Sequence, residues 1–189
     1  ISSFISSIYI YVPNLPSSID SRLRDFMFNL RGEIKPKSDS VVIPYLEKEL
    51  VTSQIEKARE IADIVIVSSH WGDEYSFKPN ESQKSYAKLM ADSGADVIIG
   101  HHPHVLQPVE WIEGKNGNKT LCVYSLGNFV SEMSEPSNMA GGMITFDIVK
   151  NGGAKPEIEN VRFTPTVYSF NSSFYENKVI FMEDYTEAM

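Results

Sequence analysis

The sequence predicts an α/β protein in which parallel βα units are followed by antiparallel strands. Two segments with helical spacing of apolar residues, about 47–62 and 82–93, each lead into a short apolar run, at 63–69 and 96–100. This rhythm of helix, strand, helix and strand is typical of a parallel sheet. After the second run the helical spacing stops, and short apolar runs separated by turn residues predict antiparallel strands.

Both helices follow from their spacing and their ends. The segment 47–62 places its charges on one side and its apolar residues on the other, and these are Val51, Ile55, Ala58 and Ile61. The segment 82–93 stops at Gly94, which suits the left-handed position that follows a helix. Its apolar residues are Tyr86, Leu89 and Met90.

The N-terminal part of the chain predicts a strand and a short helix. The stretch 1–12 is typical of a strand, and Pro13 and Pro16 break the chain after it. The helix that follows has apolar residues at helical spacing, namely Leu23, Phe26, Met27 and Leu30. A basic loop then runs to about Pro44. Because the chain begins with isoleucine and without a leader, we expect it to be an excised piece or a proteolytic product of something longer.

The second half of the chain is predicted to consist of short strands joined by turns. The runs 107–113 and 120–125 flank Asn116-Gly117, which is the pattern of a hairpin. Two further strands are predicted at 143–150 and about 158–170, on either side of an Asn-Gly-Gly turn.

Composition indicates one soluble globular domain. Of the 189 residues, 42% are hydrophobic and 22% are charged, which suffices for one core. We expect residues 1–189 to form a single incomplete domain whose tail, 171–189, is a lid, an edge strand or a poorly ordered segment. The net charge of −8, without a stripe of lysine or arginine, excludes nucleic acid as an expected partner. The lone Cys122 cannot form an internal disulfide, and no apolar stretch is long enough to span a membrane.

All four histidines fall within one short part of the chain, and they carry the strongest functional signal. His70 ends one predicted parallel strand, and His101, His102 and His104 follow the next. Because the carboxyl ends of neighbouring parallel strands meet at one edge, we expect the ring nitrogens of His70, His102 and His104 to lie within about 8 Å of one another. Imidazole is the commonest side-chain metal ligand, so the pattern predicts a metal or phosphate site. A lone histidine after a strand is more often an ordinary residue, so this prediction depends on all of them together.

The segment His102-Pro103-His104 is predicted to be stiff and extended, with both histidines binding one metal ion. Alternate side chains of an extended segment project to the same side. Proline fixes its own φ and biases the preceding residue toward extended conformations, so less entropy is lost on binding. The alternative is that these histidines only satisfy one another at the edge of a sheet.

Three strings between residues 60 and 130 point to a known family. They are Val-Ser-Ser-His-Trp-Gly-Asp-Glu-Tyr at 67–75, the stretch 94–110 around Gly-His-His-Pro-His, and Tyr-Ser-Leu-Gly-Asn-Phe at 124–129. Together with Gln83, they resemble the CapA-type capsule synthesis proteins, which are linked to poly-γ-glutamate capsules of bacteria.

The resemblance implies the C-terminal part of a calcineurin-like metallophosphatase-type αββα sandwich, with a metal centre on loops at strand ends. It implies His70, His102 and His104 as metal ligands and His101 as a general acid or phosphate contact. It further implies a divalent ion such as Mn, Zn, Fe or Ni, and a phosphoester or an anionic polymer as substrate. The implied location is the extracellular face of the bacterial cell membrane or the cell envelope, with a membrane synthase complex as a partner.

The carboxylates that the family places upstream of the matched strings are not found in this chain. Two divalent ions about 3.5–4 Å apart need bridging anionic oxygen, which neutral imidazoles do not supply. Asp73 and Glu74 lie near enough to His70 to contribute. Asp96 lies at the other end of its strand from His101, at least about 13 Å away, so it is not expected to be a ligand. A dinuclear centre is therefore expected only with the upstream half, and the fragment alone should have little or no phosphatase activity.

Five neighbours of the histidines have roles that the sequence leaves open. Trp71, Gly72 and Tyr75 either line a substrate pocket or close the end of the strand as a structural unit. Glu74 is expected to contact the substrate or to support a ligand. Asn128 either forms a hydrogen bond that orients a histidine or is an ordinary turn residue.

Two functions follow from these expectations. In the first, the complete protein is a metal-dependent hydrolase of a phosphoester or polymer linkage, in which the ion activates water. In the alternative, the domain is a non-catalytic component of a polymer-synthesis complex with a partial metal site. The net charge of −8 disfavours direct binding of a polyanion unless a cation bridges the two. A truncated sheet also exposes a strand edge, which favours a homo-oligomer.

Overall fold

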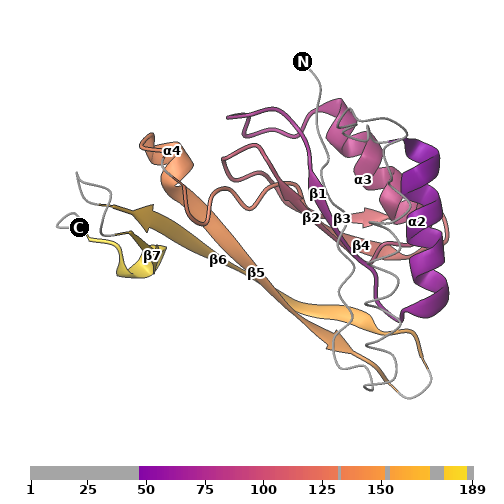
Figure 1. Ribbon diagram of the computed structural model, residues 1–189. Helices are drawn as coiled ribbons and strands as arrows, with labels where there is room; N and C mark the ends of the chain where they lie inside the picture. Colours follow the sequence, from indigo (N-terminus) through magenta and orange to yellow (C-terminus); the bar gives the residue numbers. More distant parts are fainter. Residues whose placement is uncertain (1–46, 132, 152–153, 171–176, 187–189) are drawn as a thin grey trace, which may run out of the picture.

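The centre of the computed structural model is a mixed four-stranded sheet in the order β1-β2-β4-β3 (Figure 1). Its parallel strands are β1 (Ile66–His70), β2 (Val97–His101) and β4 (Lys119–Val123). Strand β3 (Val109–Glu113) runs antiparallel to β4 and forms the predicted hairpin with it. The loops that follow β1 and β2 therefore leave the sheet at the same edge.

The structure describes residues 47–131, 133–151, 154–170 and 177–186. The strand and helix predicted for the first 44 residues lie outside this part. Within it, the chain is a mixed α/β protein with parallel and antiparallel strands, as the sequence predicts.

Two helices, α2 (Lys48–Ile61) and α3 (Glu81–Ser93), cover one face of the central sheet (Figure 1). Both agree with the predicted helices to within one residue at each end. The buried face of α2 contains three of the four predicted apolar residues, Val51, Ile55 and Ala58. Ile61, the fourth, is 50% exposed because the helix ends there. Gly94 ends α3 with a φ of 103°, a left-handed conformation that glycine adopts without strain.

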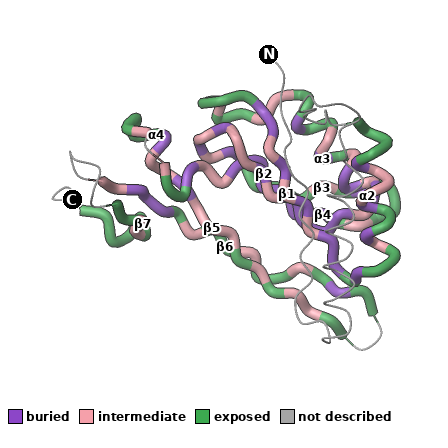
Figure 2. The backbone as a smooth tube through the Cα atoms, viewed as in Figure 1, coloured by how far each residue is buried: buried purple, intermediate pink, exposed green. Residues whose placement is uncertain are grey.

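The core lies between the two helices and the sheet, where Figure 2 shows buried residues concentrated. Its members include Ile55, Val67, Met90 and Ile98, which are fully buried. Burial of one such side chain stabilises a fold by about 1.5–3 kcal/mol. Cys122 belongs to the same core, and burial raises the pKa of its thiol. It is therefore the small, unreactive apolar residue that its sequence context predicts.

Asp96 closes the amino end of β2, at the opposite end of the strand from His101. Its carboxylate accepts a hydrogen bond from the Val65 N–H at 2.8 Å, pairs with Lys155 at 2.9 Å and pairs with Arg59. Because the Val65 N–H donates to this side chain, β1 begins at Ile66 rather than at the predicted residue 63. Asp96 thus anchors the back of the sheet rather than the histidine end.

A second, antiparallel sheet contains β5 (Ala140–Val149), β6 (Glu157–Ser169) and β7 (Lys178–Phe181). It lies on the side of the first sheet opposite to α2 and α3 (Figure 1). Figure 2 shows much of the β5–β6 ribbon as partly buried or exposed. Strand β5 begins earlier than the predicted residue 143, because its first residues pair with β6 and also contact the loop after β4.

The tail supplies an edge strand, one of the three alternatives that the sequence leaves open for it. Strand β7 pairs only with β6 in this sheet, and a short 3-10 helix, Met182–Asp184, follows it. Neither this helix nor α4 (Pro136–Met139), which precedes β5, is predicted from the sequence. Both are single turns, too short to show apolar periodicity.

Candidate metal centre

The histidines meet at the carboxyl ends of β1 and β2. His70 and His101 are register partners on the two parallel strands. The ring centroids of His70 and His102 are 4.6 Å apart, and those of His102 and His104 are 6.0 Å apart. The structure thus brings together the imidazoles that the strand order places at one edge.

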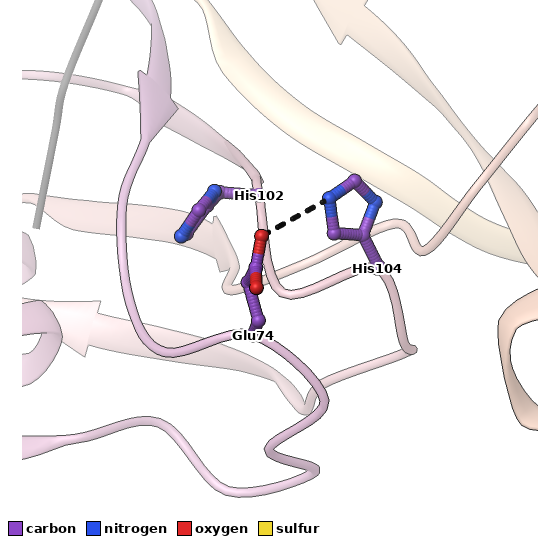
Figure 3. Close-up of side chains that lie close together, drawn as sticks. All are labelled: Glu74, His102 and His104. Carbon is purple, nitrogen blue, oxygen red and sulfur yellow. Dashed lines mark ion pairs between the residues drawn. The ribbon is translucent and has the colours of Figure 1, made fainter. Parts of the chain in front are cut away.

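Glu74 joins two of these imidazoles from the loop after β1. The ligand atoms of Glu74, His102 and His104 all lie within 4.8 Å of one another. Figure 3 shows the carboxylate pointing toward the space between the two rings. The distance from Glu74 Oε1 to His104 Nε2 is 3.9 Å, and half of the Glu74 side chain remains exposed. Two imidazoles and one carboxylate therefore face a common point.

The backbone around Pro103 forms a turn, so the prediction that His102-Pro103-His104 is extended is wrong. His102 has a φ of 100° and His104 a φ of 59°, both in the left-handed region. The Pro103 carbonyl accepts a hydrogen bond from the Tyr75 N–H at 2.7 Å, which fixes this turn against the loop after β1. Such conformations cost about 1–3 kcal/mol each for residues other than glycine, and they cluster at binding sites.

Trp71 closes the end of β1 from inside the protein. It is only 2% exposed, and its Nε1–H donates to the Tyr124 carbonyl oxygen at 2.9 Å. Its backbone N–H donates to the His101 carbonyl oxygen at 3.1 Å, which ties β1 to β2 beside the histidines. Of the two roles open to Trp71, the structure favours the buried, structural one.

Gln83 braces the loop that carries Glu74, and sequence reasoning missed this role. Its side chain accepts from the Asn80 N–H at 3.0 Å and donates to Gln107 Oε1 at 2.8 Å. Gln107 in turn donates to the Ser76 carbonyl oxygen at 2.7 Å. Gly72 passes directly over this amide with a φ of 87°, and a Cβ there would lie 2.6 Å from the Gln83 side chain. The available signal was the glutamine three residues after an asparagine, which is a capping box.

Tyr75 lies on the open side of the site. Its side chain is 52% exposed, and its ring stacks on that of His104 with centroids 6.1 Å apart. Its φ of 64° is left-handed, like those of the two histidines beside it. Tyr75 is therefore accessible to a ligand, in contrast to buried Trp71.

Asn128 supports His104 from the loop after β4. Its Oδ1 lies 2.9 Å from His104 Nδ1, and its Nδ2 donates to the Asn138 carbonyl oxygen at 2.9 Å. The hydrogen bond to a histidine is one of the two roles that the sequence leaves open for this residue.

Burial keeps part of the cluster neutral. It lowers the pKa of His70, with a smaller contribution from the neighbouring histidines, and it also lowers the pKa of His101. Both imidazoles are therefore predominantly uncharged at neutral pH, which is the form that binds metals. On the far side of Trp71, burial and a hydrogen bond to Glu110 raise the pKa of Tyr124, so its hydroxyl stays protonated.

A family model described as "Bacterial capsule synthesis protein PGA_cap" matches residues 14–133, more than half of the chain. The matched part includes both histidine-bearing loops and Asn128. The chain belongs to this bacterial capsule synthesis family. Membership in the family associates the chain with the bacterial cell envelope.

Curated members of the capsule synthesis family are similar to this chain. The PGA biosynthesis protein CapA of Bacillus subtilis (strain 168) is 39% identical over 128 residues, which are 68% of this chain and 32% of the relative. The capsule biosynthesis protein CapA of Bacillus anthracis is 39% identical over 113 residues, 58% of this chain and 26% of the relative. A probable polyglutamine synthesis accessory protein of Mycobacterium tuberculosis is 32% identical over 82 residues, 43% of this chain and 20% of the relative.

The chain thus spans about a third of the length of the B. subtilis relative, and a smaller share of the other two relatives. In the part that the structure describes, no helix is long and apolar enough to cross a membrane.

Proposed function

We propose that this chain is the metal-binding part of a capsule or poly-γ-glutamate biosynthesis protein, and that Glu74, His102 and His104 hold one divalent ion. The observation that carries the proposal is the spacing of their ligand atoms, which all lie within 4.8 Å of one another. The residues come from two separate loops that Pro103 and Tyr75 join by a backbone hydrogen bond. The fold, rather than proximity in the sequence, therefore brings Glu74 close to the two histidines.

The donor set and its spacing suit a borderline divalent ion. Protein nitrogen and oxygen atoms bind zinc at about 2.0–2.2 Å, so two ligands of one ion lie about 3–4 Å apart. The 3.9 Å between Glu74 Oε1 and His104 Nε2 is within this range. Separations of up to 4.8 Å within the group require only a small movement of its side chains, of which Glu74 is half exposed. Two imidazoles and one carboxylate suit zinc, manganese, iron or nickel.

The reaction class that this arrangement supports best is hydrolysis of a phosphoester or of a linkage in an anionic polymer. A bound divalent ion lowers the pKa of water and stabilises developing negative charge. In this proposal His70 adds a ligand from the end of β1, and His101 serves as an acid or phosphate contact. Tyr75 offers an exposed ring beside His104 on which a substrate can pack. In this proposal the complete domain is an αββα sandwich of the calcineurin-like metallophosphatase type, located at the extracellular face of the cell membrane.

A non-catalytic role in a polymer-synthesis complex is the second candidate. The observation that favours it is the single carboxylate in the group of Glu74, His102 and His104. Two ions close together need a bridging carboxylate in addition to terminal ligands, whereas one ion does not. In this role, one bound cation would join the acidic chain, with its net charge of −8, to an anionic polymer.

Calorimetric titration with Zn²⁺ and Mn²⁺ tests the metal site. We expect one ion per chain, binding at least about tenfold weaker in Glu74→Gln, and no binding in the double variant His102→Ala/His104→Ala. Glu113→Gln is the matched control, because this exposed residue is the register partner of Lys119 at the other end of the sheet from the histidines. Equal affinities in Glu74→Gln and the unmodified chain would refute the assignment.

Hydrolysis of p-nitrophenyl phosphate separates the two functions. Little or no turnover is expected from the 189 residues alone, since the group contains one carboxylate and cannot bridge two ions. Turnover by a protein of the relatives' full length, lost in Glu74→Gln, would support the hydrolase. Metal binding without turnover in that longer protein would support the non-catalytic role. Robust metal-dependent turnover by this chain alone would contradict the single-ion proposal.

A further inference from the structure

We propose that Asn128 is a positioning residue that holds His104 in the tautomer with the proton on Nδ1, so that Nε2 keeps a lone pair facing Glu74. The inference rests on the proposed function for its metal ion, and it adds a role for the loop after β4 and for the segment that contains α4. Two independent contacts determine the orientation of the Asn128 amide.

The amide of Asn128 has one orientation that satisfies its surroundings. The residue is 9% exposed, and its Nδ2 lies 2.9 Å from the Asn138 carbonyl oxygen, which can only accept a hydrogen bond. The same Nδ2 lies 3.5 Å from a second carbonyl oxygen, that of His104. A flipped amide would place its oxygen against both carbonyl oxygens. Oδ1 must therefore be the atom that faces the imidazole, 2.9 Å from His104 Nδ1.

An amide oxygen has no proton to give, so His104 Nδ1 must supply the hydrogen of this bond. A neutral imidazole carries one N–H, and with that proton on Nδ1 the lone pair lies on Nε2. Nε2 is the ring atom 3.9 Å from Glu74 Oε1. Without an acceptor at Nδ1, the proton is free to occupy Nε2, where it blocks metal binding. A hydrogen bond from the other ring nitrogen fixes metal-binding histidines in general.

The second sheet holds Asn128 in place. Gly127 and Gly141 form a bridge between the loop after β4 and the start of β5, and the Gly142 N–H donates to the Leu126 carbonyl oxygen at 2.9 Å. A Cβ on Gly141 would collide with the Asn128 carbonyl oxygen, so the two backbones touch there. His104 is therefore oriented, through the amide of Asn128, by β5, a strand that lies later in the chain.

Long-range proton–nitrogen NMR of the histidine rings tests the inference directly, in protein without metal. Nδ1–H and Nε2–H tautomers have distinct nitrogen shifts, and the chain has only four histidines to assign. We expect His104 as the Nδ1–H tautomer in the unmodified protein. We expect Asn128→Ala to move it toward Nε2–H and to weaken Zn²⁺ binding by roughly 10–100-fold.

Two variants separate positioning from a merely structural effect. Asn128→Asp retains an oxygen acceptor for Nδ1–H and should keep the tautomer, although it loses the donor to Asn138. Asn138→Ala removes another buried amide of this segment without touching His104, and it should leave the tautomer unchanged. If Asn128→Ala does not fold, the unmodified protein and Asn128→Asp still decide the matter.

An Nε2–H tautomer in the unmodified protein would overturn the inference, as would an unchanged tautomer in Asn128→Ala. The expected tautomers without any binding of Zn²⁺ would support the positioning role and overturn the proposed metal site. The two failures are therefore distinguishable.

Discussion

At the scale of single residues, the site depends on backbone conformations that most side chains avoid. Tyr75, His102 and His104 all have positive φ, and in the described part of the chain only Asn160 shares this feature among residues other than glycine. At about 1–3 kcal/mol each, these conformations persist only where neighbouring contacts determine them. The hydrogen bond to the Pro103 carbonyl oxygen and the contact of Asn128 with His104 are such contacts.

A glycine beside the histidines provides the first prediction. A Cβ at Gly100 would lie 2.5 Å from Trp71 Nε1 and still closer to the Tyr124 carbonyl oxygen, the two partners of the hydrogen bond that closes β1. We expect Gly100→Ala to lower the free energy of unfolding by roughly 3 kcal/mol, as measured by urea denaturation. The reason is that the Tyr124 backbone and the buried Trp71 ring cannot move aside. Gly117→Asn is the control, since nothing lies within 4 Å of Gly117 and asparagine tolerates its φ of 75°. Equal losses in both variants would contradict the steric argument.

At the scale of elements, the loop between β1 and α3 is held by side chains rather than by a sheet. Gln83, which is 1% exposed, links the first turn of α3 to Gln107, and Gln107 holds the loop at Ser76. In the same loop, the Asp73 carboxylate accepts a hydrogen bond from the Asn80 side chain at 2.8 Å. Glu74 is thereby left as the carboxylate that faces the histidines.

Removal of this brace provides the second prediction. We expect Gln83→Ala to cost about 1–3 kcal/mol of stability, because it removes half of a capping box and leaves the buried Gln107 amide without this partner. Amide hydrogen exchange should increase across residues 72–80 while α2 remains protected. Gln54→Ala on α2 is the matched control and should leave the loop unchanged. Unaltered exchange in the loop of Gln83→Ala would show that the backbone alone holds it.

At the scale of the whole molecule, the partly buried imidazoles connect stability to pH. Burial lowers the pKa of both His70 and His101 below the ordinary value of 6.5. Between that value and the lower pKa of the folded state, the unfolded chain binds more protons than the folded one. Stability is therefore retained above about pH 6.5 and is lost as the pH falls below it.

Thermal unfolding of the metal-free protein between pH 7.5 and pH 5 measures this dependence and forms the third prediction. We expect the midpoint to fall across this range, and His70→Gln to make the decrease shallower, since glutamine does not titrate. Glu113→Gln, an exposed position at the other end of the sheet, should leave the slope unaltered. A midpoint that rises as the pH falls would contradict the assignment of His70 as a partly buried, neutral group.

By itself, the sequence determined the order of helices and strands and the edge at which the imidazoles meet. Apolar spacing places α2 and α3 to within one residue, because it records which face of a helix is buried. The meeting of His70 with the later cluster follows from parallel strand order alone.

Only the tertiary structure decided which neighbours complete the site. Asp73 and Glu74 are adjacent in the sequence, yet Asn80 engages one, and the other faces His104. The role of Asn128 and the left-handed turn around Pro103 likewise depend on partners from other segments of the chain. Local sequence patterns predict which residues are buried and where the chain turns. These hydrogen bonds, in contrast, join residues that come together only after the sheets have packed.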